Sequence, residues 1–182
     1  MPVRMALLGA GFIGAVHAHN LAAHPSVDVV GVCDVDADRA GALAQSVGAA
    51  AINVDHALDT TRVDAVLIAS STDTHADLLR RAAAAGVHAL CEKPIDLDLD
   101  RAVDVAAAVR ASGITAMVDF NRRFDADHRT LRDAVHAGEI GAVELITMTT
   151  RGPSLPPLAY LAVSGGQMRD QTVHFFDLAR WI

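Results

Sequence analysis

The sequence is poor in lysine, in aromatic side chains and in cysteine, and these shortages exclude several classes of protein. Lys93 is the only lysine among 15 basic residues, which face 22 acidic ones and leave a formal net charge of −7. A nucleic-acid-binding domain normally carries a basic face, so this balance argues against such a partner. Cys33 and Cys91 lie far apart and form no Cys-x-x-Cys pair, which argues against a zinc or redox site and favours two buried strand thiols.

Long hydrophobic runs are also missing. No apolar stretch approaches the ~18 residues of a membrane span, and the first residues lead into a strand pattern rather than a secretory signal. These features, together with the unpaired cysteines, predict a cytoplasmic protein. With 52% hydrophobic residues but only 4% aromatic ones, the chain has enough apolar material for a packed core of small aliphatic side chains.

Short apolar segments alternate with longer helical ones over the first two thirds of the chain. We expect strands at residues 3–8, 27–33, 65–69, 87–91 and 114–120, with helices at residues 13–24, 36–47, 73–85 and 97–111. This alternation is typical of an α/β fold in which crossover helices connect the strands of a doubly wound parallel sheet. The first domain is therefore predicted at residues 1–120.

The character of the chain changes after residue 120, where a second α/β domain is expected to begin. We predict a helix at 126–137, a strand at 143–150, an extended crossing at 151–157 and a helix that follows the glycines at 165 and 166. That last helix runs to Trp181 and Ile182 without a terminating residue. The sequence therefore predicts that residues 121–182 are only the beginning of the second domain.

Gly9, Gly11 and Gly14 form a Gly-x-Gly-x-x-Gly motif between the first predicted strand and helix. The first glycine permits a tight turn, the second lets a pyrophosphate approach the backbone, and the third lets the helix pack closely on the sheet. Asp34 follows the second strand, where a carboxylate can accept both ribose hydroxyls of NAD and repel the 2′-phosphate of NADP. Arg39 could instead serve a phosphate, although it is more typical of a solvated helix face.

Small and hydroxyl-bearing residues follow the strand at 65–69. Because ligands of doubly wound sheets bind outside the carboxyl ends of the strands, Ser70, Ser71 and Thr72 are candidates for contact with the nicotinamide ribose. The alternative is that this segment only caps the following helix. His75 is either a cofactor contact or an ordinary residue of the first helical turn.

Lys93 follows the strand at 87–91 and precedes a proline that favours extended geometry at the lysine. A lysine amine, unlike a guanidinium, can exchange a proton when it is desolvated. Farther along the chain, Asp170 and His174 lie four residues apart and would share one face of a continuous helix. Histidine is the natural proton acceptor near neutral pH, and a neighbouring carboxylate can orient it. Helix capping by Asp170 and a two-ligand metal site are the alternatives, and the latter lacks a third ligand.

These motifs together resemble those of the Gfo/Idh/MocA oxidoreductases, and within that family the inositol 2-dehydrogenases. The resemblance extends along the whole chain and includes the glycine motif, Ser-Thr-Asp-Thr-His at 71–75, Glu-Lys-Pro at 92–94, Asn-Arg-Arg-Phe-Asp at 121–125, and Asp-x-x-x-His-x-x-Asp-x-x-Arg-Trp at 170–181. It implies a Rossmann domain followed by an α/β domain, NAD as cofactor, a cyclic polyol or sugar as substrate, and homo-oligomers of the longer family members.

The resemblance also implies roles for individual residues. Lys93, Asp170 and His174 would be catalytic, with His174 as general base, and Asn121 and Arg122 would line the substrate pocket beside them. No metal is expected. The expected cofactor-binding residues are Gly9, Gly11, Phe12, Ile13, Gly14, Asp34, Ser70, Ser71, Thr72, His75, Glu92 and Lys93. A dinucleotide-binding fragment or sensor without turnover, or a different small-molecule reductase on the same fold, is the alternative function.

Overall fold

The computed structural model describes residues 1–152 and 155–182, with the side chain of residue 159 also left out of the description. The chain divides into two compact units, Met1–Asp119 and Phe120–Ile182. Among the described residues, no helix is long and apolar enough to cross a membrane.

The first unit contains a six-stranded sheet in which every strand runs parallel to its neighbours, in the order β3-β2-β1-β4-β5-β6. The prediction of a doubly wound parallel sheet is therefore confirmed. The strands are β1 (Val3–Leu8), β2 (Val27–Cys33), β3 (Ala50–Ala51), β4 (Ala65–Ile68), β5 (His88–Cys91) and β6 (Ala116–Val118). The helices are α1 (Phe12–Ala23), α2 (Ala37–Ser46), α3 (Val54–Ala57), α4 (Thr72–Ala85) and α5 (Leu99–Ser112).

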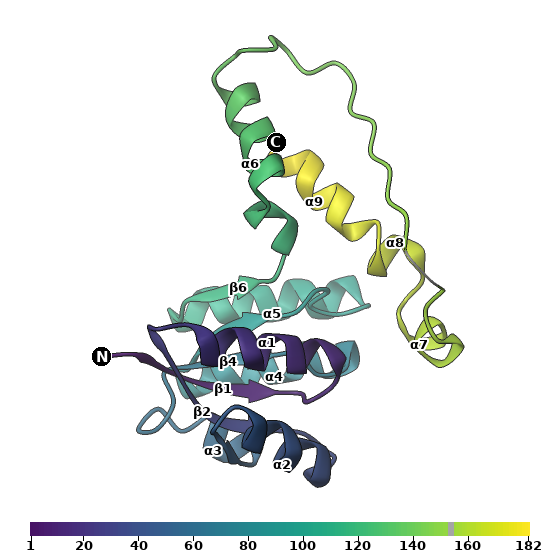
Figure 1. Cartoon of the computed structure of the whole chain (residues 1–182). Coiled ribbons are helices and arrows are strands. Elements are labelled where there is room, and N and C mark those ends of the chain that lie inside the picture. The colour runs from purple at the N-terminus through teal and green to yellow at the C-terminus, as the bar shows by residue number, and fades with distance from the viewer. Residues whose placement is uncertain (153–154) are drawn as a thin grey trace. The chain divides into compact units, whose positions relative to one another are not determined.

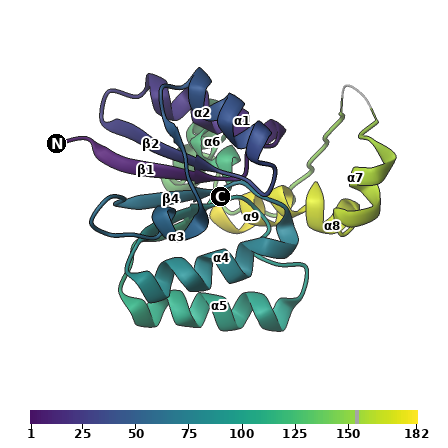
Figure 2. The ribbon, with the colours of Figure 1, turned by 90° about the horizontal axis from the view of Figure 1, so that it is seen from below.

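Helices cover both faces of this sheet, with α1 and α2 on one side and α4 and α5 on the other (Figure 2). Successive residues of a strand point to opposite faces, and β1 supplies both cores in this way. Leu7 packs in a cluster with Ala18 of α1, whereas Leu8 packs in a second cluster with Leu79 of α4. The small aliphatic core expected from the composition is the one that forms.

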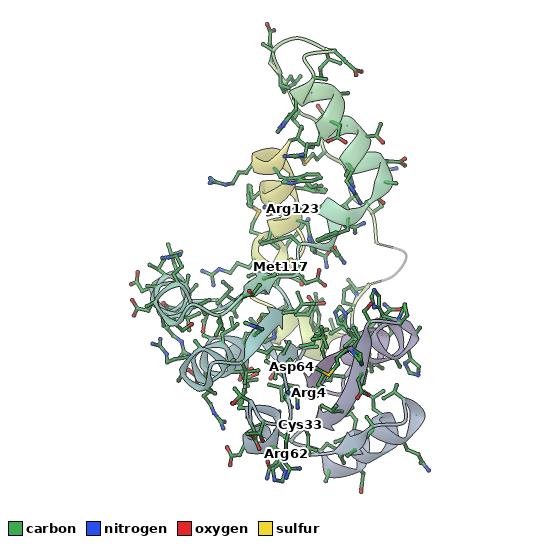
Figure 3. The ribbon with its side chains drawn as sticks, turned by 90° about the vertical axis from the view of Figure 1, so that its left-hand side faces the viewer. Arg4, Cys33, Arg62, Asp64, Met117 and Arg123 are labelled. Atoms are coloured by element: carbon green, nitrogen blue, oxygen red, sulfur yellow. The ribbon has the colours of Figure 1, made fainter. Side chains whose placement is uncertain are left out.

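The strand order reverses at β1, which pairs with β2 on one side and β4 on the other. The segments that follow β1 and β4 therefore pass to opposite faces of the sheet. The carboxyl ends of these two strands form the crevice in which doubly wound sheets bind ligands. At the opposite edge, Arg4 and Asp64 lie side by side (Figure 3), with Arg4 Nε donating to Asp64 Oδ2 at 3.1 Å.

Both cysteines are buried thiols in the first unit, as predicted. Cys33 ends β2 and Cys91 ends β5, and burial raises the pKa of the Cys91 thiol to about 12. A thiol with such a pKa stays protonated and unreactive near neutral pH.

The second unit is built from short helices and extended segments (Figure 1), and polar contacts join parts of it that are distant in sequence. Arg123 Nε donates to Asp177 Oδ2 at 2.8 Å, and the Arg132 guanidinium lies 4.9 Å from the centre of the Trp181 ring. The elements are η1 (Asn121–Phe124, a 3-10 helix), α6 (Ala126–His136), α7 (Leu158–Val163), α8 (Gln167–Asp170) and α9 (Val173–Trp181).

Two predictions for the second unit are wrong. Residues 143–150 do not form a strand, because a strand needs a hydrogen-bonding neighbour and the described residues offer none to this segment. The single helix expected after the glycines is two helices, interrupted at Gln171 and Thr172. The expected crossing at 151–157 includes residues 153 and 154, which lie outside the described residues.

Candidate cofactor and catalytic site

The glycine loop has the geometry that its three glycines predict. Gly9 has φ of +109°, and a Cβ there would lie 2.5 Å from the backbone of Ala69. A Cβ at Gly14 would lie 2.0 Å from the carbonyl oxygen of Gly9. A Cβ at Gly11 would contact nothing within 4 Å, so no protein atom requires a glycine there. The space above Gly11 is therefore available for a ligand to approach the backbone.

The amino terminus of α1 faces this space. Gly11 is the N-cap residue and supplies no side-chain cap, so the first N–H groups of the helix are available to phosphate oxygens. Phe12 and Ile13, the next two residues, expose their apolar side chains. An uncapped helix end beside exposed apolar side chains is suited to an amphiphilic anion such as a dinucleotide.

Asp34 lies directly after β2, and its carboxylate is tied to the glycine loop. Oδ2 accepts a 2.6 Å hydrogen bond from the Ala10 amide, while Oδ1 accepts one from the Asp36 amide at 2.9 Å. Arg39 also donates to Oδ1, at 3.0 Å. Burial raises the pKa of Asp34, but the two amides and the arginine outweigh burial and lower it. Asp34 is therefore a fixed negative charge at the end of β2.

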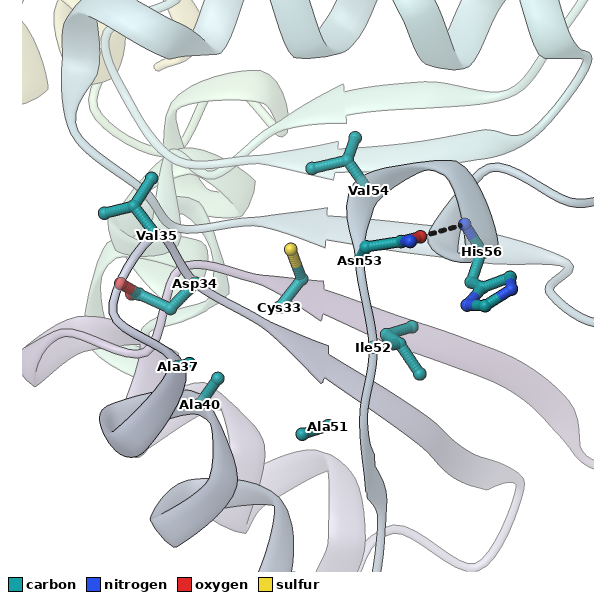
Figure 4. Close-up of a pocket in the computed structure, with 10 residues that line it drawn as sticks. All are labelled: Cys33, Asp34, Val35, Ala37, Ala40, Ala51, Ile52, Asn53, Val54 and His56. Carbon is teal, nitrogen blue, oxygen red and sulfur yellow. Dashed lines mark hydrogen bonds between the residues drawn. The ribbon is translucent and has the colours of Figure 1, made fainter.

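An open hollow of about 630 Å³ lies beside Asp34 (Figure 4). Its size falls within the range of small-molecule sites, and its lining is mostly apolar. The lining residues are Cys33, Asp34, Val35, Ala37, Ala40, Ala51, Ile52, Asn53, Val54 and His56. A flat apolar group joined to a ribose on Asp34 would fit this hollow.

The hydroxyl-rich segment after β4 forms a tight, internally bonded turn. The hydroxyls of Ser70 and Thr74 lie 2.6 Å apart, and Thr74 donates to the Ser71 carbonyl at 2.7 Å. Ser71 is the N-cap residue of α4, yet its hydroxyl caps no amide. Capping therefore does not account for the side chain of Ser71. Thr72 is the first residue of α4.

His75 is 2% exposed and lies between two loops. Its Nδ1 is 2.8 Å from the Pro94 carbonyl oxygen, and its Nε2 is 3.0 Å from the Ser70 carbonyl oxygen. Both ring nitrogens are thus directed at backbone oxygens, which favours a role in holding the loops together. Contact between His75 and a cofactor stays a prediction.

Lys93 stands at the carboxyl end of β5, on the same edge of the sheet as the glycine loop. The preceding residue, Glu92, and Asp119 both lie beside His17, and the sequence did not associate these three residues. His17 of α1 places Nε2 2.8 Å from Glu92 Oε1 and 3.7 Å from Asp119 Oδ2. The Lys93 amide donates to Glu92 Oε2 at 3.2 Å. This His17–Glu92–Asp119 group is a charge cluster of low exposure at the carboxyl ends of the strands.

The second unit places Asp170 and His174 on different helices, α8 and α9, and not on one helical face as expected. Asp170 is buried, and Oδ1 accepts a 2.7 Å hydrogen bond from the Tyr160 hydroxyl while Oδ2 accepts one from the Gln171 amide. The His174 ring meets the Phe120 ring edge-on at 6.3 Å between centroids. Burial and these hydrogen bonds hold the Asp170 carboxylate in a defined orientation.

Asn121 and Arg122, the other predicted substrate residues, are exposed on η1. Their neighbour Arg123 is committed to the ion pair with Asp177, which raises the pKa of the Arg123 guanidinium. In η1, Asn121 and Arg122 are therefore exposed, whereas Arg123 holds α9 in place through Asp177.

Comparison with known proteins decides the family. The family model described as an oxidoreductase family with an NAD-binding Rossmann fold matches residues 3–120, and the model of the GFO/IDH/MocA C-terminal domain matches residues 128–182. The chain belongs to the Gfo/Idh/MocA oxidoreductase family. The resemblance inferred from the motifs is therefore confirmed.

Gfo/Idh/MocA relatives of known name are similar along the whole chain. Inositol 2-dehydrogenase of Rhizobium meliloti is 44% identical over 100% of this chain and 55% of its own length. Myo-inositol 2-dehydrogenase of Thermotoga maritima is 36% identical over 99% of this chain and 54% of its own length. The chain thus spans about half the length of the curated relatives it matches.

Solved structures of named dehydrogenases share the fold closely. A myo-inositol dehydrogenase from Corynebacterium glutamicum superposes with a TM-score of 0.91 at 40% identity, over 100% of this chain and 55% of that one. A scyllo-inositol dehydrogenase from Lactobacillus casei, solved with NAD(H) and scyllo-inositol, gives a TM-score of 0.84 at 25% identity, over 100% of this chain and 56% of that one.

Several residues of this Gfo/Idh/MocA site were missed in the sequence. The hollow depends on β3 and α3, which have two and four residues and carry no clear periodicity. His17 lies 75 residues from Glu92, so spacing could not associate them. The only available signal was that His17 follows Gly14 by less than one helical turn and must therefore start near the loop.

Proposed function

We propose that this protein, as part of a chain of the length of its relatives, is an NAD-dependent oxidoreductase. Its substrate is a secondary alcohol of a cyclic polyol or sugar, with inositols as the first candidates. The observation that carries the proposal is the placement of the chain's single lysine, Lys93, at the carboxyl end of β5, on the sheet edge that bears the open Gly11 loop. Relatives named as inositol dehydrogenases support the substrate class.

The residues of the first unit fit a dinucleotide. The uncapped amide groups at Gly11, Phe12 and Ile13 would hold the pyrophosphate, and Asp34 would accept the hydroxyls of the adenosine ribose. The hollow beside Asp34 would take the adenine. The turn from Ser70 to Thr72 would lie near the nicotinamide ribose, and Glu92 beside it. When bound, NAD supplies the carbon that accepts a hydride.

Asp34 underlies the preference for NAD over NADP. Its carboxylate keeps its charge because its pKa is lowered, and a 2′-phosphate would meet that charge directly. Arg39, which could have served the phosphate, is instead bonded to Asp34 Oδ1. We expect NAD to bind more tightly than NADP for this reason.

Lys93, Asp170 and His174 would carry out the proton chemistry. His174 would remove the proton of the reacting hydroxyl as general base, while Lys93 donates a hydrogen bond to the same oxygen and stabilises its developing negative charge. Asp170, held by Tyr160, would orient the substrate and the histidine. The carbon–hydrogen bond of the alcohol breaks with its electron pair moving as hydride, so the alcohol becomes a ketone. Asn121 and Arg122 would bind the remaining hydroxyls.

Location and assembly belong to the same proposal. The acidic composition supports an enzyme that binds no nucleic acid, and the two buried thiols support a cytoplasmic location. The family resemblance supports homo-oligomers. No predicted role requires a metal. Size-exclusion chromatography with light scattering tests the oligomeric state.

The test is a substrate panel with NADH absorbance as the readout. Myo-inositol, scyllo-inositol, glucose and a linear polyol are each offered, with NAD or NADP, to the protein as part of a chain of its relatives' length. We expect turnover with NAD and at least one cyclic polyol. Tight NAD binding with no oxidation of any polyol would contradict the proposal and favour a dinucleotide-binding sensor. A preference for NADP would contradict the role of Asp34.

A further inference from the structure

The His17–Glu92–Asp119 group joins three elements at the reactive edge of the first unit. His17 comes from α1, Glu92 follows β5 and Asp119 follows β6, and their side chains are only 16%, 12% and 13% exposed, respectively. The function proposed above gives no role to His17 or Asp119. A histidine enclosed by two carboxylates at low exposure needs an explanation, because charges are costly to bury unless they are paired.

The charges of the group complement one another when His17 is protonated. The hydrogen bond to Glu92 and the charges of Glu92 and Asp119 raise the pKa of His17 against the opposing effect of burial. Burial raises the pKa of Glu92, but His17 and Lys93 outweigh burial and lower it. Burial and the charge of Glu92 raise the pKa of Asp119. On α1 itself, His19 turns away and bonds the Ala15 carbonyl.

Glu92 connects this charge cluster to the backbone of Lys93. One carboxylate oxygen, Oε1, lies 2.8 Å from His17 Nε2, and the other, Oε2, accepts the Lys93 amide at 3.2 Å. On the far side of Lys93, the Pro94 carbonyl oxygen lies 2.8 Å from His75 Nδ1. The backbone on both sides of the lysine is therefore held through a histidine.

We propose that His17 is a positioning residue, whose protonated ring holds Glu92 and, through Glu92, the backbone of Lys93. Loss of the His17 proton leaves Glu92 without its cationic donor and beside the carboxylate of Asp119. The two carboxylates then repel each other, and the acceptor of the Lys93 amide is released or rotated. The geometry of the lysine would thus depend on the charge of His17. The catalytic meaning of this dependence rests on the function proposed above, whereas the linkage itself does not.

The same three residues bring possible metal ligands within 4.8 Å of one another, but the distances favour a proton. Two ligands of a tetrahedral zinc with bonds near 2.1 Å are separated by about 3.4 Å. His17 Nε2 and Glu92 Oε1 are 2.8 Å apart, which is the length of a charge-assisted hydrogen bond. A metal between them would require the pair to separate.

The single lysine makes a selective test possible. Protein labelled only with ¹⁵N-lysine gives one backbone amide signal, that of Lys93, which can be followed by NMR through a pH titration. We expect this signal to shift with a midpoint above the ordinary histidine value of about 6.5. The ring signals of His17, observed with ¹⁵N-histidine, should titrate with the same midpoint. Different midpoints in the unmodified protein would overturn the proposal, whatever the behaviour of variants.

Three variants sharpen the test. His17→Gln keeps a hydrogen-bond donor but is uncharged and cannot titrate, so the Lys93 signal should no longer shift with the midpoint seen in the unmodified protein. His19→Gln, on the same helix but exposed, should leave the titration unchanged. Asp119→Asn removes a negative charge and should lower the midpoint. A shift retained in His17→Gln, or lost in His19→Gln, would overturn the proposal.

The remaining outcomes separate the inference from its rivals. If micromolar zinc displaces the Lys93 signal and a chelator restores it, the cluster is a metal site and the proposal is wrong. If no polyol is oxidised but the coupled titration is observed, the proposed function fails and the positioning role of His17 stands. If a polyol is oxidised while the Lys93 signal does not shift with the titration of His17, the proposed function stands and the positioning role of His17 fails.

Discussion

In the first unit, aliphatic side chains are buried on both faces of the sheet, whereas in the second unit Leu178 is the only buried apolar side chain among the described residues. The other buried residues described in the second unit are Ser164, Asp170 and Asp177. The first unit is thus stabilised mainly by apolar burial, whose free energy scales with the buried area. The positions of the buried side chains can be recognised in the sequence as a periodic pattern of hydrophobic residues. The second unit depends on particular polar pairs, which leave little trace in sequence.

The difference predicts that close backbone packing dominates the stability of the first unit. Gly14→Ala should destabilise it by about 3 kcal/mol or more, because the new Cβ would lie 2.0 Å from the Gly9 carbonyl oxygen. Urea unfolding followed by circular dichroism measures the loss. Gly41→Ala is the matched control, since a Cβ there would contact nothing and alanine favours a helix interior. Equal stability of the two variants would contradict this packing.

In the second unit, we expect the ion pair between Arg123 and Asp177 to contribute strongly to stability. Asp177→Asn should destabilise the packing of α9 by about 1–3 kcal/mol, because it weakens a charge-assisted bond to a half-exposed Arg123. Trp181, the only tryptophan, reports this unit by fluorescence during urea unfolding. Asp133→Asn, an exposed control on α6, should shift the fluorescence midpoint by much less. A shift in circular dichroism equal to that in fluorescence would show that the two units do not unfold independently.

Gly11→Ala should separate binding from stability within the first unit. We expect NAD affinity to fall at least about tenfold, since a methyl group would occupy the approach of the pyrophosphate. The free energy of unfolding, measured with urea, should stay within about 0.5 kcal/mol of that of the unmodified protein, because no protein atom lies near that Cβ. Isothermal titration calorimetry measures the affinity. Unchanged affinity would show that the cofactor does not approach this loop.

The smallest effect is expected at the edge of the sheet away from the site. Hydrogen bonds from Arg4 lower the pKa of Asp64 to about 2, below its unfolded value of about 3.9. The stabilisation is therefore complete above about pH 4 and is lost as the pH falls through about 2. Asp64→Asn and Arg4→Met should each flatten the acid dependence of the urea midpoint. Steeper acid unfolding in either variant would contradict the pairing.

Sequence reasoning succeeded where the physical cause is local. The glycine loop, Asp34 after β2 and Lys93 after β5 could be predicted because a motif, a strand end and a helix start follow one another within a few residues. The alternation of strands and helices fixed the parallel sheet in the same way. Two short elements, β3 and α3, were not predicted. For the predicted strands the ends moved, as for β6, where residues 114–120 were expected and Ala116–Val118 forms the strand.

Sequence reasoning failed where partners come from distant segments. The pairing of His17 with Glu92 and of Arg123 with Asp177 is set by the fold and not by spacing. The segment 143–150 has strand-like composition but lacks a partner strand among the described residues. Asp170 and His174 have helical spacing, yet the chain turns at Gln171, so each side chain sits in its own helix.

The most direct test of the proposed chemistry is the turnover of Lys93→Arg in the protein that oxidises a cyclic polyol. Arginine keeps the positive charge but not the compact amine that can reach and polarise the reacting oxygen. We predict that kcat falls at least about a hundredfold while NAD affinity stays within about threefold. Unchanged kcat in Lys93→Arg would contradict a role for this lysine in the reaction.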